Sequence, residues 1–317
     1  MVKLGSILFL DSTHPILPEK LQKMGFTIDY DFSSSKEEII NKISNYQGVI
    51  IRSRLKLDKN ILKPAKNLKF IGRVGSGLEN IDTDYAHSKG IFCLNSPEGN
   101  RDSVGEHTLG LLLAITNNIV KSNNEVKNGF WFREENRGME INGKTIAIIG
   151  YGNMGSAFVQ RLSGFKANVI AYDKYKFGFG NKLVNETSME EIFKTADIIS
   201  FHIPYTEETH YLLNRDFLSK FEKNIIILNT SRGKIVNTDD LVDALKSKKV
   251  IAAGLDVIEY ESTSLQNKPI SYWSESMQYI ANAENVILTP HIAGWSNESN
   301  IKLSEVLFDK IVQIINT

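Results

Sequence analysis

Three short segments carry residue types that together can bind an anion and move a proton. Arg232 lies in the segment NTSRG, Glu261 ends the segment LDVIEYE, and His291 lies in the segment TPHIAG. An imidazole exchanges a proton near neutral pH, a carboxylate can orient its ring, and a guanidinium offers a planar fork to a carboxylate. Because each residue type standing alone is more often structural than functional, the three are candidates only as a set.

The positions of these segments favour a shared site. Each segment directly follows an apolar run that predicts a β-strand, at 224–229, 251–255 and 286–288. In open parallel sheets, ligands bind outside the carboxyl ends of the strands. We therefore expect the three side chains to converge at one edge of a sheet.

A glycine-rich segment at 145–155, TIAIIGYGNMG, predicts a dinucleotide site. An apolar strand precedes Gly150, Gly152 and Gly155, which have the G-x-G-x-x-G spacing, and a helical stretch follows. Glycines at these positions allow a tight turn, close approach to a pyrophosphate and close packing of helix on strand, while the helix N-terminus supplies N–H donors. Glycine-rich turns are common, so the prediction of a dinucleotide site depends on the strand before the glycines and the helix after them.

An acidic residue, Asp173, ends the next predicted strand, 18 residues after Gly155. This is near the distance expected for the residue that binds the adenosine ribose. Its carboxylate would repel a 2′-phosphate, so NAD is favoured over NADP as the cofactor. Lys174 and Lys176 lie close enough in sequence to weaken that preference.

Short apolar runs separated by helix-compatible stretches recur along the chain. One series lies at 7–10, 48–51, 69–74 and 91–94, and a second at 145–150, 168–172, 197–201, 224–229, 251–255 and 286–288. Strands that alternate with helices predict parallel sheets covered by helices on both faces. The fold class is therefore α/β, with two doubly wound parallel-sheet domains.

A long helix is expected to join the two sheets. Ser103 followed by Glu106 predicts a capping box at its start, and apolar residues then recur at helical spacing. The amphipathic segment 301–315 follows the last strand of the second series and could return to the first domain. The predicted domains are residues 1–99 with 295–317, and residues 100–294.

Composition excludes several classes of function. The 37 basic and 37 acidic side chains balance, so no overall field would draw the protein to nucleic acid or to a membrane surface. Cys93 is the only cysteine, which excludes intrachain disulfides and cysteine-based metal clusters and favours a reducing, cytoplasmic location. No apolar run reaches the roughly 18 residues of a membrane span, and we expect no metal site.

The sequence resembles the D-isomer-specific 2-hydroxyacid dehydrogenase family over nearly its whole length. The segments that carry the resemblance are GRVGSGLENID (72–82), SVGEHTLGLLL (103–113), the glycine turn, HIPYTEETHYLLN (202–214), NTSRG, LDV and NVILTPHIAG (285–294). The resemblance implies a flavodoxin-like substrate-binding domain, 1–99 plus 295–317, and a Rossmann NAD-binding domain, 100–294, with a cleft between them. It also implies NAD-dependent hydride transfer to or from C2 of a 2-hydroxy or 2-oxo carboxylate.

The family's functional residues map onto this chain. Arg232, Glu261 and His291 stand at its catalytic positions: His291 as general acid and base, Glu261 on the other ring nitrogen, and Arg232 on the substrate carboxylate. The cofactor would be bound by Ser76 of the first domain, by the glycine turn and by residues near the ends of the following strands. These residues are Ser76, Gly150, Gly152, Asn153, Met154, Gly155, Asp173, His202, Pro204, Thr209, Thr230, Ser231, Asp256 and Gly294.

The substrate is the open question at the level of sequence. Backbone N–H groups of Ser76 and Gly77 are expected to hold its carboxylate, and Arg52 and Arg73 to face the cleft. Phosphoglycerate dehydrogenases resemble the chain at both arginines and at Lys56, which favours 3-phosphoglycerate and phosphohydroxypyruvate, the substrates of serine biosynthesis. The chain would be a short form without the regulatory extensions of many members. A hydroxypyruvate, glyoxylate or other D-2-hydroxyacid reductase is the alternative.

The resemblance further implies a homodimer, with the interdomain helix and the aromatic segment GFWFR at 129–133 in the interface; packing of these aromatics on their own domain is the other interpretation. Two departures stand out: Ser262 replaces the proline that commonly follows the catalytic Glu, and the segment 263–283 is longer than usual. That segment is either a lid or a surface excursion. From another functional class, a dinucleotide-sensing protein without catalysis remains an alternative, although the retained trio argues against it.

Overall fold

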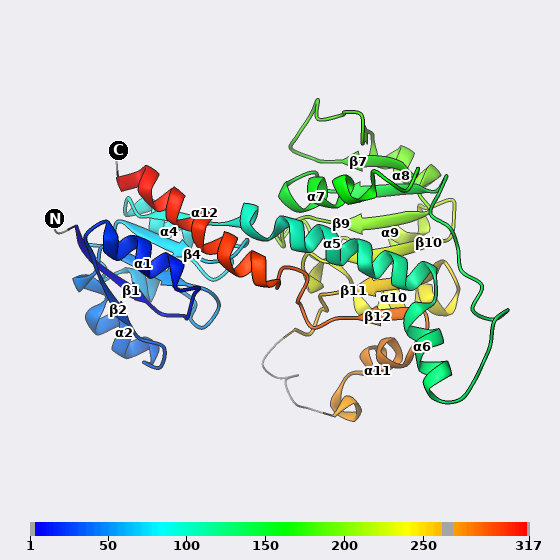
Figure 1. The fold of residues 1–317 in the computed structure, drawn as a ribbon, viewed down its shortest axis with the longest axis horizontal. Helices are drawn as coiled ribbons and strands as arrows, with labels where there is room; N and C mark the ends of the chain where they lie inside the picture. Colours follow the sequence, from blue (N-terminus) through cyan, green and yellow to red (C-terminus); the bar gives the residue numbers. More distant parts are fainter. Residues whose placement is uncertain (1–3, 262–268, 316–317) are drawn as a thin grey trace. The chain divides into compact units, whose positions relative to one another are not determined.

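The computed structural model describes residues 4–261 and 269–315, which form two compact units (Figure 1). Unit 1 contains residues 1–101 and 295–317, and unit 2 contains residues 102–294. The chain therefore leaves unit 1, completes unit 2 and returns to unit 1 at its C-terminal end.

Unit 1 is built on a five-stranded parallel sheet with the strand order β2-β1-β3-β4-β5. This is one of the two common orders of doubly wound sheets, the flavodoxin-like one. The bounds of the strands are β1 (Gly5–Phe9), β2 (Phe26–Tyr30), β3 (Gly48–Ile51), β4 (Phe70–Arg73) and β5 (Phe92–Asn95).

Helices cover both faces of this sheet. The C-terminal helix α12 (Asn297–Ile315) packs beside α1 (Ile16–Lys23) on one face, where Leu303, Leu307 and Ile311 join the buried core. The other face is covered by α2 (Lys36–Lys42), η1 (Ile43–Asn45), α3 (Lys59–Leu62) and α4 (Thr83–Ser88). The core of unit 1 thus includes a segment that follows all of unit 2 in the sequence.

Unit 2 is built on a seven-stranded parallel sheet with the strand order β12-β11-β10-β9-β6-β7-β8. The order reverses between β6 and β9, and the crevice at such a switch point is where open α/β sheets bind ligands. The bounds of its strands are β6 (Thr145–Ile149), β7 (Asn168–Tyr172), β8 (Asn185–Glu186), β9 (Ile198–Phe201), β10 (Ile225–Asn229), β11 (Val250–Leu255) and β12 (Val286–Leu288).

Two apolar layers cover this second sheet. One contains α5 (Pro97–Thr116) and α7 (Asn153–Leu162). The opposite one contains α8 (Met189–Thr195), α9 (Arg215–Ser219), η2 (Gly233–Ile235), α10 (Thr238–Lys246) and α11 (Glu275–Asn282). The two parallel-sheet domains confirm the predicted α/β fold class.

The predicted start of the interdomain helix is wrong. Helix α5 begins at Pro97, a residue tolerated in a first turn because its missing N–H has no partner there in any case. Ser103 lies inside the helix, and its hydroxyl donates to the Ala293 carbonyl at 2.7 Å instead of capping. The helix stops near Asn118, whose left-handed backbone (φ 51°) precedes α6 (Ile119–Lys127).

All ten predicted strands are present, and the structure adds two edge strands, β2 and β8, that the sequence did not predict. Ser262 and the first part of the long segment, residues 263–268, lie outside the described residues. The described remainder forms η3 (Ile270–Tyr272) and α11, which buries Met277 and Ile280 against unit 2. This packing favours a fixed surface element over a lid for 269–283. Within the described ranges, no helix is long and apolar enough to cross a membrane.

Candidate active site

The three glycines of the turn after β6 differ in their surroundings. Gly150 and Gly155 lie against neighbouring backbone atoms, whereas Gly152 faces open space. A Cβ on Gly150 (φ 93°) would lie 2.6 Å from the His202 carbonyl oxygen, and a Cβ on Gly155 would lie 2.1 Å from the Gly150 carbonyl oxygen. At Gly152, which precedes the first residue of α7, no atom lies within 4 Å of such a Cβ. Packing therefore demands glycine at 150 and 155, while 152 leaves the helix N-terminus accessible to an anion.

The carboxylate of Asp173 fixes the loop after β7 beside this turn. One oxygen accepts from the Tyr151 N–H at 2.8 Å, and the other accepts from the N–H groups of Tyr175 and Lys176 at 2.9 and 3.1 Å. A carboxylate has about four acceptor positions, so one remains for a ribose hydroxyl. The role of Asp173 at the ribose stays a prediction.

The segment after β9 supplies His202, Pro204 and Thr209. The Nε2 atom of His202 lies 2.9 Å from the Ser200 hydroxyl, while its buried Nδ1 has no hydrogen-bond partner among the described residues. Burial lowers the pKa of His202 from 6.5 to about 3, so the ring is neutral. The Thr209 hydroxyl donates to the Pro204 carbonyl at 2.7 Å.

The segment after β10 positions Arg232. Asn229 is fully buried; its side-chain oxygen accepts from the Ser231 N–H and hydroxyl at 3.0 and 2.7 Å, and its amide donates to the Arg232 carbonyl at 3.0 Å. The Thr230 hydroxyl lies 3.1 Å from that of Thr108. Arg232 Nη1 donates to the Ser231 carbonyl at 2.7 Å, which orients its guanidinium.

The next residue, Gly233, ties this segment to the loop after β11. A Cβ at Gly233 would lie only 1.8 Å from the Ile258 carbonyl oxygen. The Ile258 N–H in turn donates to Glu261 Oε1 at 2.7 Å. The backbones that carry Arg232 and Glu261 therefore touch, and only glycine at 233 allows this.

A buried carboxylate, Asp256, shapes the loop that carries His291. Its side chain is 1% exposed and accepts from the Thr289 hydroxyl at 2.6 Å and from the N–H groups of Ile292 and Ala293 at 2.9 and 2.8 Å. Its backbone carbonyl accepts from the His291 N–H at 2.8 Å. Asp256 was expected to contact the cofactor; in the structure its carboxylate holds the histidine loop.

His291 and Glu261 are in direct contact. His291 Nδ1 lies 2.6 Å from Glu261 Oε2, and both side chains are partly exposed, at 48% and 33%. His291 has a left-handed backbone (φ 55°), an uncommon conformation outside glycine that persists only where surrounding contacts fix it. The carboxylate occupies one ring nitrogen and leaves Nε2 as the other site for proton exchange.

In unit 1, Arg52 follows β3 and Arg73 is the last residue of the adjacent strand β4. The Arg52 guanidinium lies 4.8 Å from the centre of the Trp295 ring, and its backbone N–H donates to Asp11 at 2.6 Å. Arg73 Nε donates to the Arg52 carbonyl at 3.2 Å. One arginine thus stacks on an aromatic face, and the other links the two strand ends.

The glycine-rich turn of unit 1 is fixed through the carbonyl and side chain of Ser76. The Asn95 amide donates to the Ser76 carbonyl at 2.6 Å, and the Ser76 hydroxyl donates to Asn100 at 2.7 Å. Among the described residues, the N–H groups of Ser76 and Gly77 have no hydrogen-bond partner. These two donors are the ones expected to hold a carboxylate.

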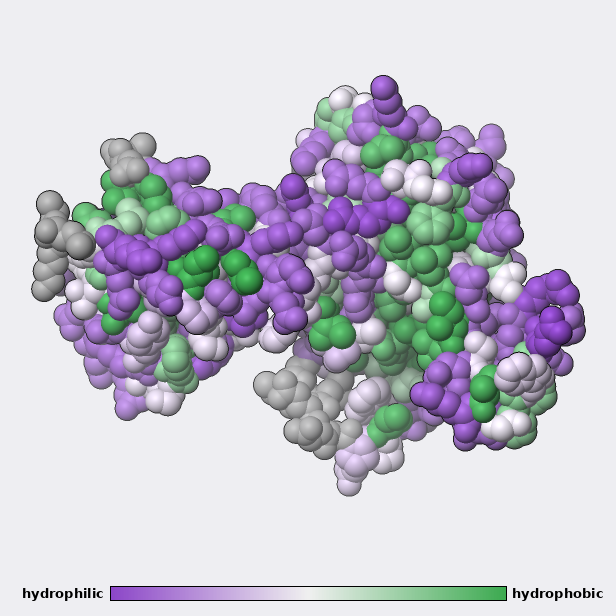
Figure 2. Space-filling view, viewed as in Figure 1, coloured by the Kyte–Doolittle hydropathy of each residue, from purple (hydrophilic) through white to green (hydrophobic). Residues whose placement is uncertain are grey.

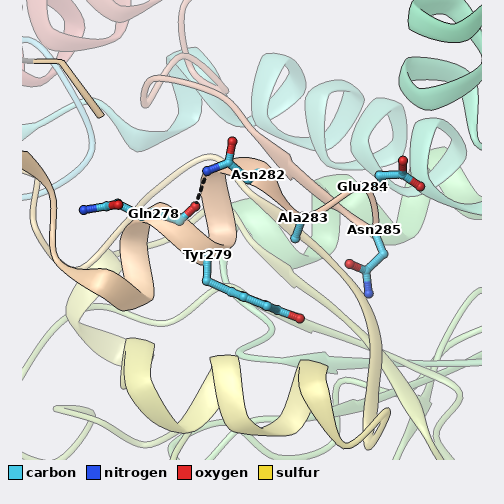
Figure 3. Close-up of a pocket in the computed structure, with 6 residues that line it drawn as sticks. All are labelled: Gln278, Tyr279, Asn282, Ala283, Glu284 and Asn285. Atoms are coloured by element: carbon cyan, nitrogen blue, oxygen red, sulfur yellow. Dashed lines mark hydrogen bonds between the residues drawn. The ribbon is translucent and has the colours of Figure 1, made fainter. Parts of the chain in front are cut away.

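Several positioning residues escaped the sequence analysis, chiefly Asp11, Thr289 and Trp295. Thr289 lies two residues before the predicted His291 and has the side chain of a typical loop cap, so it offered a local signal. The partners of Arg52 lie 41 and 243 positions away in the sequence, and no local pattern reveals them. A hollow beside α11, lined by residues from Gln278 to Asn285, contains none of the predicted site residues (Figure 3). Within the described ranges, no cluster of His, Cys, Asp and Glu could hold a metal ion.

Comparison with known proteins places this geometry in a family. The model of the D-isomer specific 2-hydroxyacid dehydrogenase, NAD binding domain, matches residues 109–293, more than half of the chain. The chain belongs to the D-isomer specific 2-hydroxyacid dehydrogenase family. The matched range contains the glycine turn, Asp173 and the trio, and all of them lie in unit 2.

Members of this family with different names are similar to the chain. A D-3-phosphoglycerate dehydrogenase of Archaeoglobus fulgidus is 34% identical over 93% of the chain, and the chain spans only 54% of its length. A hydroxypyruvate reductase of Thermotoga maritima is 35% identical over 87% of both proteins. A structure of D-lactate dehydrogenase from Aquifex aeolicus, complexed with NAD and lactic acid, superposes with a TM-score of 0.82 at 28% identity, covering 98% of the chain and 96% of its own.

The residues of unit 2 fit NAD, the cofactor of the family. The open position at Gly152, the uncapped N-terminus of α7, the remaining acceptor position on Asp173 and the buried, unpartnered Nδ1 of His202 all lie on or beside the turn after β6. The first three would hold a pyrophosphate and a ribose.

The neutral His202 predicts a pH-dependent loss of stability. Its pKa is lower in the folded state than in the unfolded state, so between pH 6.5 and 3 the unfolded chain binds a proton that the folded protein does not. Stability therefore falls as the pH drops through this window, by about 2 kcal/mol between pH 7 and 5 from this group. His202→Gln, which can keep the bond to Ser200, should lose less stability in urea unfolding at pH 5 relative to pH 7. The exposed His87→Gln is the control, and an equal loss in wild type and His202→Gln would contradict the assignment.

Proposed function

We propose that this protein is an NAD-dependent oxidoreductase that transfers a hydride between nicotinamide and C2 of a small 2-hydroxy or 2-oxo carboxylate. The observation that carries the proposal is the contact of 2.6 Å between His291 Nδ1 and Glu261 Oε2, at the carboxyl edge of the sheet that also carries the glycine turn. Membership of the family and the fit of unit 2 to a dinucleotide support it.

The trio suits oxidation of a hydroxy acid and the reverse reaction. NAD, when bound, takes or supplies the hydride at C2. His291 Nε2 takes the hydroxyl proton as the C2–H bond breaks, and returns it in the reduction. Glu261 holds the ring through Nδ1 and stabilises the imidazolium, while Arg232 binds the substrate carboxylate through its planar fork. The alternative, a dinucleotide sensor without catalysis, would not require a histidine paired with a carboxylate in this way.

Replacing the histidine separates catalysis from cofactor binding. His291→Ala should lower kcat by about 10²–10⁴-fold, because general acid–base catalysis contributes that much, and should leave the Kd for NADH nearly unchanged. Glu261→Gln should do less harm and shift the pH profile of kcat. Turnover is followed at 340 nm with a panel of 2-oxo acids, and exposed His87→Ala is the control. Near-normal turnover of His291→Ala would assign the proton to another group; NADH binding without turnover by the wild type would favour the sensor.

For the substrate, we propose a phosphorylated acid, 3-phosphoglycerate or phosphohydroxypyruvate, and hence a role in serine biosynthesis. Arg52 and Arg73 at the ends of β3 and β4, together with the N–H groups of Ser76 and Gly77, give unit 1 donors for two anionic groups. The name of the Archaeoglobus fulgidus relative supports this proposal. The name of the Thermotoga maritima relative supports the runner-up, an unphosphorylated hydroxypyruvate.

The two arginines provide the test of the phosphate. Charge-assisted hydrogen bonds contribute about 1.5–3 kcal/mol each, so two arginines would favour the phosphorylated acid by roughly 10²–10⁴-fold. The wild type should show this preference in kcat/KM for phosphohydroxypyruvate over hydroxypyruvate, and the double variant Arg52→Ala with Arg73→Ala should lose it. Lys66→Ala, in the exposed turn before β4, is the control. No preference in the wild type, or an intact one in the double variant, refutes the phosphate.

We also propose that the chain forms a homodimer through α5, α6 and the segment after α6. None of the residues of α6 is buried, and Phe130, Trp131 and Phe132 are 52%, 76% and 45% exposed. About half or more of each ring is thus left exposed by its own unit, which favours the dimer over packing on the same domain. Figure 2 shows apolar residues over α5 and around α6 with hydrophilic ones at their border. A second copy of this chain is the partner that fits the family.

The dimer is tested by light scattering at micromolar concentration. The wild type should have twice the mass of the chain, and Trp131→Glu, which places a charge among the aromatics, should shift the mass toward that of a monomer. Tyr272→Glu, on an aromatic that is 77% exposed outside this surface, should leave the mass unchanged. A monomeric wild type would refute the proposal.

A cytoplasmic location stays a prediction from the composition.

A further inference from the structure

The loops after β7 and β9 are joined by the side chain of Glu208. One carboxylate oxygen pairs with Lys174 Nζ, and the other accepts from the Tyr175 hydroxyl at 2.5 Å. Lys174 and Tyr175 directly follow Asp173, whereas Glu208 lies 34 positions further along the chain than Lys174. Strands β7 and β9 flank β6, so these loops lie on either side of the glycine turn.

The carboxylate of Asp173 is fixed by its own loop, and the loop that carries Glu208 is ordered by Thr209. Three N–H groups bind the Asp173 carboxylate, as described above. Next to Glu208, the Thr209 hydroxyl accepts from the Thr206 N–H at 2.8 Å and donates to the Pro204 carbonyl at 2.7 Å. The direction of each pKa agrees with a charged pair: the bond to Glu208 raises the pKa of Lys174, and the bond to Lys174 lowers that of Glu208.

A cofactor with a 2′-phosphate would need a cation at this place. Such a group carries about −1.5 to −2 charges at pH 7, and the acid expected at the ribose is Asp173. Lys174 is the adjacent cation in the sequence, but Glu208 holds its ammonium group. The second lysine, Lys176, donates to the Tyr151 carbonyl at 3.2 Å.

We propose that Glu208 is a second determinant of the preference for NAD over NADP, because it withholds Lys174 from a 2′-phosphate and adds a negative charge to the loop that follows Asp173. The inference rests on the NAD site proposed above and extends it to a residue outside the glycine turn. Glu208 is a specificity-determining residue with no part in hydride or proton transfer.

The test compares Glu208→Gln with Glu207→Gln, its exposed neighbour. The Kd values of NADH and NADPH are measured by nicotinamide fluorescence. Removing the charge of Glu208 should tighten NADPH binding about threefold to fivefold, because solvent screens charges at an exposed site. NADH binding should change by less than about twofold, and Glu207→Gln should change neither. Because the site is exposed, roughly 1 M salt should reduce the gain.

A second variant identifies the cation. Adding Lys174→Ala to Glu208→Gln should abolish the gain in NADPH affinity, whereas binding of NADH should persist. An unchanged Kd for NADPH in Glu208→Gln overturns the inference, and a gain that survives the loss of Lys174 overturns the role given to the lysine. A wild type that binds no NADH would instead contradict the proposed function, so the two failures are distinguishable.

Discussion

The buried carboxylate of Asp256 is the interaction on which the proposed active site depends. It sits at the end of β11 and accepts three hydrogen bonds from the loop after β12. An unpaired carboxylate at this depth would be strongly unfavourable, so the loop is bound to wrap around it. The same wrapping turns the backbone of His291 into the left-handed region and directs its ring toward Glu261. The local strain at the histidine is thus offset by bonds to one neighbouring strand end.

Close backbone contacts at two glycines also position the loops of the site. At Gly155 the helix α7 meets the turn after β6, and at Gly233 the segment of Arg232 meets the loop of Glu261, in both cases too closely for any Cβ. These contacts fix the spacing between whole loops. Because the trio comes from the ends of three strands, β10, β11 and β12, the relative spacing of these ends determines whether an arginine, a glutamate and a histidine can act on one molecule.

The parts of this arrangement that are local in sequence could be predicted. Buried strands were found because their apolar runs are unbroken, and the glycine turn was found because its spacing follows from the shape of a dinucleotide. The edge strand β2 was missed because Thr27, Asp29 and Tyr30 are exposed and break its apolar pattern. The start of α5 was misplaced because Ser103 and Glu106 fit a capping pattern, while the true partner of Ser103 is the distant Ala293. The aromatic support of Arg52 and the pairing of Lys174 with Glu208 arise in the same way from distant segments, so only the fold reveals them.

The return of α12 to unit 1 has a consequence for the order in which the protein folds. Leu303, Leu307 and Ile311 fill one side of the unit 1 core, yet the ribosome makes them after the whole of unit 2. Unit 2 is continuous in sequence and can form its core first. Until α12 has been synthesised, the face of the unit 1 sheet that α12 covers stays exposed to solvent. That face is a liability for aggregation while synthesis continues, and contacts this distant in sequence form slowly. Unit 1 is therefore expected to be the late-folding and chaperone-dependent half of the molecule.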